Sequence, residues 1–209
     1  MSQGPVQRIL VWDAPLRLFH WLSVLSFVLA YATAQSERWR LLHVSAGYTL
    51  GGLVLLRLVW GLVGSRYARF RAFVRGPAAV LRYLRSLTGS NPEHHVGHNP
   101  AGALAIVLML ACGLGLLLSG WAIFNDLAGE WLAQVHAWIA NALLALVLLH
   151  LGGVVTASYL HRENLLLAML TGYKQGPPGQ GIQRPGWRLA AVILLGVLGF
   201  WWLQWRAAP

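Results

Sequence analysis

The sequence is poor in charged residues, and above all in acids. Of its 209 residues, 16 are Lys or Arg and only 6 are Asp or Glu, whereas 57% are hydrophobic and 11 are tryptophan. A soluble domain of this length needs a more polar surface than this composition supplies. The scarcity of charge therefore excludes an ordinary soluble globular protein and predicts an integral membrane protein.

Cysteine is almost absent as well. The single cysteine, Cys112, excludes a disulfide bond within the chain. The chain also lacks any Cys-x-x-Cys-His motif, the signal for thioether attachment of haem. Any haem bound here would therefore be held without a covalent link, as in b-type cytochromes.

Long apolar stretches are what the sequence does contain. Five are long enough to cross a hydrocarbon layer about 30 Å thick: Leu16 to Ala34, Leu41 to Gly64, Pro100 to Phe124, Trp131 to Leu160 and Leu189 to Trp205. Because lipid cannot satisfy free backbone polar groups, each span should be helical. We predict an all-α integral membrane protein, with a four-helix transmembrane bundle in residues 1–172 and a fifth C-terminal transmembrane helix within 173–209.

The connections between the predicted spans differ in character. Residues 65–99 mix arginines with apolar side chains, which predicts a short amphipathic helix on the cytoplasmic surface. The connection from Gly172 to Gly186 is rich in Gly, Pro and Gln, which predicts a flexible tether to the fifth span.

The net charge of +10 is distributed unevenly about the predicted membrane. Three bases fall on one side, Arg38, Arg40 and Arg206. Twelve fall on the other: Arg8, Arg17, Arg66, Arg69, Arg71, Arg75, Arg82, Arg85, Arg162, Lys174, Arg184 and Arg188. By the positive-inside rule the N-terminus is cytoplasmic, and the C-terminus lies outside if the fifth segment spans. No nucleic-acid binding is expected, because the arginines are not interleaved with stacking aromatics.

Four histidines lie inside the predicted spans, where an imidazole is costly and usually functional. His136 and His150 are fourteen residues apart on one segment, a spacing that turns a helix by roughly 1,400° and raises it by about 21 Å. Both therefore share one face at opposite depths. Given the predicted orientation, His20 lies near the inner surface and His43 near the outer surface. The depths pair His20 with His150, and His43 with His136.

Each histidine pair could supply both axial nitrogens of one haem iron, which leaves no open coordination position and favours electron transfer over oxygen binding. Small residues one turn after two of the histidines, Gly47 and Ala140, would leave room for a flat porphyrin, although small residues also serve plain helix contact. The alternative is that these histidines only form hydrogen bonds with neighbouring helices.

Three further residues are candidates for the same sites. Arg57 follows His43 by fourteen residues, so it lies on nearly the same face at the inner level, where a guanidinium can bind a haem propionate. Arg17, one turn before His20, is a second candidate, and the alternative for both is that they snorkel to the inner surface. His98 lies where the third span enters from the cytoplasm and could exchange protons with a quinone. Zinc binding by the neighbouring loop histidines is not expected.

Over residues 8 to 172 the chain resembles the prokaryotic cytochrome b-561 family, which includes the cytochrome b subunits of nickel-iron hydrogenases. The residues that carry the resemblance are Arg17-Leu18-Phe19-His20-Trp21, Leu42-His43-Val44-Ser45-Ala46-Gly47-Tyr48, Leu56-Arg57-Leu58-Val59-Trp60-Gly61, Gly97-His98-Asn99-Pro100-Ala101-Gly102, His136 with His150, and Arg162-Glu163-Asn164-Leu165.

This resemblance implies a four-helix core in which the four histidines ligate two b haems. It also implies electron transfer between a membrane quinone and a partner, which in the family is a hydrogenase, a periplasmic cytochrome c or, in free-standing forms, superoxide. The fifth span departs from the family's four-helix pattern.

The sequence therefore predicts a multi-pass, lipid-embedded di-haem cytochrome b of the bacterial inner membrane. It would pass electrons between the quinone pool and a cytochrome c or hydrogenase-like partner. One alternative is a free-standing quinone oxidoreductase that acts on a small oxidant or reductant such as superoxide. Another is a non-redox scaffold or transporter with structural histidines. No catalytic residue is predicted.

Overall fold

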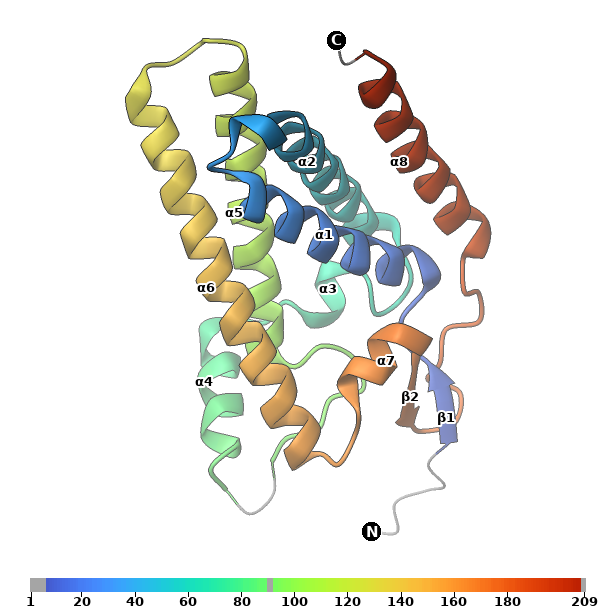
Figure 1. Ribbon diagram of the computed structural model, residues 1–209. Helices are drawn as coiled ribbons and strands as arrows, with labels where there is room; N and C mark the ends of the chain where they lie inside the picture. Colours follow the sequence, from blue (N-terminus) through green and yellow to red (C-terminus); the bar gives the residue numbers. More distant parts are fainter. Residues whose placement is uncertain (1–6, 90–91, 208–209) are drawn as a thin grey trace.

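The five predicted spans are all helices in the computed structural model, which describes residues 7–89 and 92–207 (Figure 1). Each of the five is long and apolar enough to cross a membrane. They are α1 (Ala14–Thr33), α2 (Arg40–Val63), α5 (Pro100–Phe124), α6 (Glu130–Leu160) and α8 (Trp187–Ala207). The all-α membrane fold is confirmed, and every predicted end lies within two residues of the observed one. Residues 1–6, 90–91 and 208–209, included in the predicted domain and loop ranges, lie outside the described residues.

Capping residues set the starting points of two spans. Asp13 accepts a hydrogen bond from the amide of Leu16 at 2.7 Å before α1, and Asn99 accepts one from Gly102 at 2.7 Å before α5. A proline follows each cap in the first turn, where its missing N–H leaves no hydrogen bond unmade. Asp13 is itself buried and also accepts from Trp60 Nε1 at 3.1 Å. The start of α1, and with it the depth of His20, is thereby tied to the end of α2.

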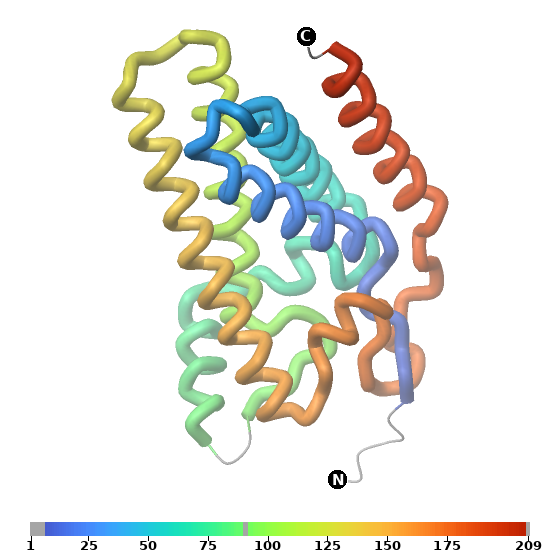
Figure 2. The backbone as a smooth tube through the Cα atoms, in the orientation of Figure 1, coloured from blue at the N-terminus to red at the C-terminus, as the bar shows by residue number. Residues whose placement is uncertain are grey.

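The spans pack in pairs. Helix α1 lies along α2, α5 lies along α6, and α2 also contacts α5, whereas the backbone of α6 stays farther from α1 and α2. Figure 2 shows α5 and α6 side by side. Helix α6 buries only Leu143 and Ala157 within the structure. Leu143 joins Phe27 and Leu50 in an apolar cluster, and it falls between His136 and His150 along α6.

The two ends of the bundle are built differently (Figure 1). One end carries the short helices α3 (Phe70–Phe73), α4 (Pro77–Ser86) and α7 (Leu165–Thr171), together with strands β1 (Gln7–Leu10) and β2 (Tyr173–Gly176). The strands pair antiparallel, with Gln7 opposite Gly176. The opposite end holds the α1–α2 connection with its 3-10 turn η1 (Glu37–Trp39), the α5–α6 connection and the C-terminal end of α8.

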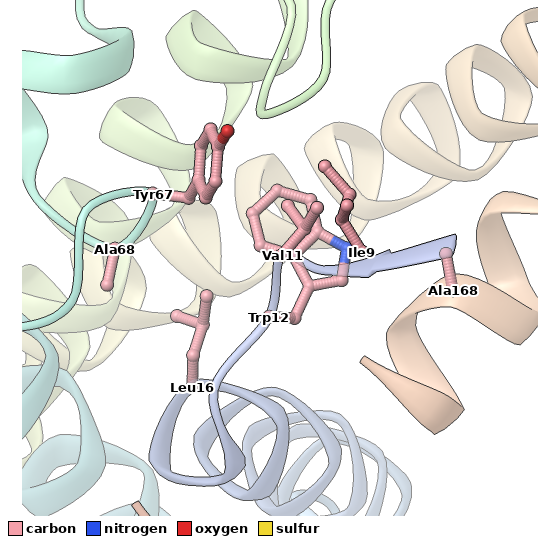
Figure 3. Packing of buried hydrophobic residues seen from close by; sticks show 7 residues of the cluster. All are labelled: Ile9, Val11, Trp12, Leu16, Tyr67, Ala68 and Ala168. Atoms are coloured by element: carbon pink, nitrogen blue, oxygen red, sulfur yellow. The ribbon is translucent and has the colours of Figure 1, made fainter. Parts of the chain in front are cut away.

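A hydrophobic cluster fills the end that carries the strands. Figure 3 shows its members, which come from the N-terminal segment, the α2–α3 connection and α7: Ile9, Val11, Trp12, Leu16, Tyr67, Ala68 and Ala168. Neither this cluster nor the strand pair was predicted. The predicted amphipathic helix is present as α4, which packs on α5 with Tyr83 buried and leaves Leu81 and Leu84 exposed.

The predicted flexible tether before α8 is wrong. Its backbone is fixed to the N-terminal segment, because Ile182 N donates to Leu10 O at 2.8 Å and Ala14 N donates to Pro185 O at 2.7 Å. Gly172, Gly179 and Gly186 adopt positive φ angles that allow the chain to turn there. The connection therefore places α8 on α1 and α2, where Trp201 Nε1 donates to Thr49 Oγ1 at 2.9 Å.

A buried ion pair fixes β2 to the turn between α6 and α7. Lys174 Nζ lies 3.0 Å from Glu163 Oε2, and the two side chains are 4% and 12% exposed. Burial alone would raise the pKa of Glu163, but the nearby imidazole of His94, the charge of Lys174 and the amide of Gln175 together lower it to about 2. Breaking such a pair leaves a buried charge without its partner.

The lowered pKa of Glu163 makes the stability of this end depend on pH. The folded-state pKa of about 2 lies below the ordinary value of 4.5, so the stabilisation is present above pH 4.5 and is lost as the pH falls toward 2. Between pH 5 and pH 3 we expect Glu163 to account for a loss of about 2 kcal/mol in the free energy of unfolding. Denaturant unfolding in detergent, followed by tryptophan fluorescence, measures it.

Glu163→Gln should unfold more easily at pH 6 and should lose less stability than the wild type on acidification. Glu37→Gln is the matched control, because the Glu37 side chain is 91% exposed. An acid-dependent loss in Glu163→Gln equal to that of the wild type would contradict the assignment.

Candidate functional site

The structure brings His43 and His136 together at the end of the bundle opposite the strands. His43 lies in the first turn of α2 and His136 in the second turn of α6, and their ring centroids are 6.4 Å apart. A metal ion lies about 2 Å from an imidazole nitrogen that binds it, so two imidazoles on opposite sides of one ion have centroids roughly 6 Å apart. The observed separation fits that arrangement.

Hydrogen bonds at the Nδ1 atoms orient these two rings. His43 Nδ1 lies 2.8 Å from the carbonyl oxygen of Ala30 on α1, and His136 Nδ1 lies 2.8 Å from Ser119 Oγ on α5. A carbonyl oxygen only accepts, so His43 carries its proton on Nδ1. Its Nε2 lone pair is therefore available to a metal ion.

His20 on α1 and His150 on α6 lie close enough for the charge of His150 to act on His20, and both act on His98. Among the described residues neither ring has a hydrogen-bond partner. Along α6, His136 is thus the histidine beside His43, and His150 is the one within range of His20. Metal ligation by either pair stays a prediction.

Open space lies beside the helices that carry these histidines. A Cβ atom added at Gly47, Gly152 or Gly153 would meet no heavy atom within 4 Å. By contrast, one added at Gly113 would lie 2.7 Å from Val54, where α5 and α2 pack closely. The backbone of α6 also stays farther from α1 and α2 than from α5. Two imidazoles from facing helices are a donor set that fits bis-histidine haem.

Arg57 is a buried cation without a carboxylate partner among the described residues. It is 2% exposed, its guanidinium carbon lies 5.0 Å from the ring centroid of Phe70 and 5.8 Å from that of Phe73, and its Nη1 has no hydrogen-bond partner. Within the described part of the chain, Asp13 is the acid whose charge acts on Arg57, and its carboxylate already accepts hydrogen bonds from Leu16 N and Trp60 Nε1. An unpaired buried charge is costly, so this site fits an anionic group.

Arg17 is more fully engaged by the protein. Its Nη2 donates to the carbonyl oxygen of Leu170 at the end of α7, and its guanidinium lies over the ring of Trp187 at 5.3 Å. Its Nε has no partner. Arg17 therefore links α1, α7 and α8, and it offers less free hydrogen-bonding capacity than Arg57.

His98 lies in the interior, between two aromatic rings. Its ring centroid is 4.5 Å from that of Trp12 and 4.6 Å from that of Phe73, which also lies under Arg57. Burial, with contributions from the charges of Arg57 and Lys174, lowers the pKa of His98 to about 3. His98 is therefore neutral at physiological pH, and its buried Nδ1 has no partner.

The remaining histidines cluster near the ion pair at the strand end. His94 and His161 have ring centroids 5.2 Å apart, and His94 Nε2 lies 3.7 Å from Glu163 Oε2. Within residues 7–89 and 92–207, no group of three or more His, Cys, Asp or Glu side chains is arranged to hold a metal ion.

Sequence reasoning missed the residues that support the histidines. Ser119, the carbonyl of Ala30 and Asp13 act across helix boundaries, so no spacing within one segment marks them. Asp13 alone had a local signal, because an acid two residues before a proline and just ahead of an apolar run is typical of a helix N-cap.

Comparison with known proteins gives a consistent family. The family model described as prokaryotic cytochrome b561 matches residues 11–172. A protein named probable Ni/Fe-hydrogenase B-type cytochrome subunit from Cupriavidus necator is 22% identical over 83% of this chain and 89% of its own length. The protein of that name from Azotobacter vinelandii is 25% identical over 79% of this chain and 88% of its own. No solved structure matches the chain significantly.

Proposed function

This chain belongs to the prokaryotic cytochrome b561 family, and on that premise we propose that it conducts electrons across a membrane through two b haems. Membership itself makes it a multi-pass membrane protein with b-type haem and a role in membrane electron transfer. The proposal adds the number of haems and their ligands: His43 with His136 for the outer haem, and His20 with His150 for the inner haem.

The observation that carries the proposal is the close approach of His43 and His136, whose ring centroids are 6.4 Å apart. It is supported by His150, which lies fourteen residues farther along α6 and within electrostatic range of His20. When bound, each haem supplies reversible one-electron redox chemistry. His43 with His136 and His20 with His150 would hold the two haems, and ligation by two histidines favours electron transfer over oxygen binding. Between His136 and His150 along α6, Leu143 packs with Phe27 and Leu50 in an apolar cluster.

The propionates of the inner haem would complete the charge balance around Arg57. We propose that the free Nη1 of Arg57 binds one propionate, because a guanidinium–carboxylate pair relieves the cost of the buried cation. Arg17 is the second candidate through its free Nε.

The electron partners follow from the predicted orientation and the relatives' names. We propose that the strand end is cytoplasmic in a bacterial inner membrane, and that a quinone exchanges electrons with the inner haem there, with His98 as a hydrogen-bonding group or proton site. At the outer haem we propose a hydrogenase-like partner, as the names of the relatives from Cupriavidus necator and Azotobacter vinelandii suggest, or a cytochrome c.

Haem content tests the ligand assignment. Purified wild-type protein should contain two haems per chain. His136→Ala should lose only the outer haem and His150→Ala only the inner one, because each change removes one of two axial ligands. The pyridine haemochrome assay, normalised to protein, counts the haems.

His94→Ala is the matched control, because His94 lies outside the spans and should leave both haems in place. Retention of two haems in both His136→Ala and His150→Ala would contradict the assignment of these histidines as haem ligands. It would favour a scaffold with structural histidines.

Arg57→Gln tests the propionate anchor. Loss of one partner from a buried, hydrogen-bonded charge pair costs about 2–5 kcal/mol, so we expect the inner haem to dissociate more readily in this variant. Any inner haem that stays bound in Arg57→Gln should have a lower reduction potential than in the wild type, because the positive charge of Arg57 favours the reduced form. Transfer of haem to apomyoglobin and a redox titration measure the two effects.

Arg71→Gln, in the exposed part of the basic connection, is the control for loss of charge alone. If Arg57→Gln and Arg71→Gln behave alike in both measurements, Arg57 does not bind a propionate.

Quinone turnover tests the inner exchange site. Protein reduced with dithionite should be reoxidised by a short-chain quinone analogue, and His150→Ala should slow this by at least about tenfold. Equal rates in the variant and the wild type would place the quinone elsewhere. Reduction of the wild type by superoxide alone, without a protein partner, would instead support a free-standing oxidoreductase.

A further inference from the structure

Ser119 has an unusually well-defined hydrogen-bond geometry. Its hydroxyl donates to the carbonyl oxygen of Gly115 at 2.7 Å, and its oxygen lies 2.8 Å from His136 Nδ1. A hydroxyl group has a single hydrogen atom to donate. A histidine that binds a metal ion through Nε2 carries its proton on Nδ1. With His136 as the proposed ligand, Ser119 Oγ is placed to accept the hydrogen bond from His136 Nδ1 while its own hydrogen goes to Gly115 O.

The same region of α5 also limits the position of the His136 ring. A Cβ atom added at Gly120 would lie 3.2 Å from His136 Cε1, closer than nearly all such contacts, so glycine allows the ring to lie against the helix backbone. Ser119 is itself 6% exposed. Two consecutive residues on α5 thus hold the imidazole of α6: Ser119 forms a hydrogen bond with it, and Gly120 leaves it space.

The two histidine levels differ in this respect. Both outer rings donate from Nδ1, to Ala30 O and to Ser119 Oγ, whereas within the described residues the rings of His20 and His150 have no such acceptor. An acceptor at Nδ1 makes the opposite nitrogen a more basic ligand. A more basic ligand stabilises the more positively charged, oxidised metal.

We propose that Ser119 is a positioning residue for the outer haem. It fixes the tautomer and rotation of His136 and lowers the reduction potential of that haem. At the inner level the buried positive charge of Arg57 acts in the opposite direction and raises the reduction potential of the inner haem. The chain therefore makes the outer haem the stronger reductant of the two. This inference rests on the proposed ligation of the outer haem by His43 and His136.

Substitution of Ser119 separates its influence from that of the ligand. In Ser119→Ala the Nδ1–H of His136 loses its acceptor, so the outer haem should be easier to reduce. We expect a change of about tenfold in its ratio of reduced to oxidised forms, which is about 59 mV for one electron. Spectroelectrochemical titration of the purified holoprotein measures both haems, and the component missing from His136→Ala identifies the outer one.

Two further variants make the test specific. Ser119→Thr keeps the hydroxyl and should restore the wild-type potential. Ser45→Ala is the matched control, because Ser45 is a buried serine whose hydroxyl has no partner, and it should shift neither haem. If Ser119→Ala does not accumulate, Ser119→Cys offers the same comparison, since a thiol is a weaker acceptor of similar size.

The outcomes separate the two proposals. An unchanged outer potential in Ser119→Ala, with both haems present, would overturn the role of Ser119 and leave the haem ligands intact. An equal shift of both haems would also overturn it, because it would indicate a general loosening of the bundle. Two haems retained in His136→Ala would instead overturn the ligand assignment itself.

Discussion

The structure depends on one unbroken helix, α6, whose backbone packs closely on α5 but stays farther from α1 and α2. Side chains bridge that larger separation: Leu143 reaches Phe27 and Leu50, and His136 meets His43. A helix in lipid gains nothing from leaving such space unfilled, because association there relies on close packing and hydrogen bonds. The separation therefore supports the proposal that groups bound between these helices complete the packing of the bundle.

Much of this arrangement was predictable from the sequence, because the membrane constrains both the length and the depth of each segment. The spans were predicted to within two residues because lipid imposes both a length and a helical backbone. The meeting of His43 with His136 was predictable because depth in a membrane follows from residue number once the orientation is known. Arg57 was a candidate because it follows His43 by fourteen residues, the same spacing that separates His136 from His150, and its side chain is buried.

Other features had no comparable signal. Strands β1 and β2 are four residues each and more than 160 residues apart, so neither composition nor periodicity marks them. The connection before α8 contains the Gly and Pro of a mobile linker, yet its amide groups bond to the N-terminal segment. Helix α5 is apolar on all sides, so no sequence pattern distinguishes Ser119 from the other small residues of that helix. In each case the decisive contact joins residues that are distant in sequence, and local patterns do not encode it.

The pairing of β1 with β2 can form only late in the synthesis of the chain. Strand β1 leaves the ribosome first, but its partner follows only after α1, α2, α5, α6 and α7 have been made. The end of the bundle that carries the strands therefore cannot complete its strand pair until all eight histidines are in the chain. A newly made protein passes through a stage in which α1, α2, α5 and α6 are already present while β1 still lacks its partner.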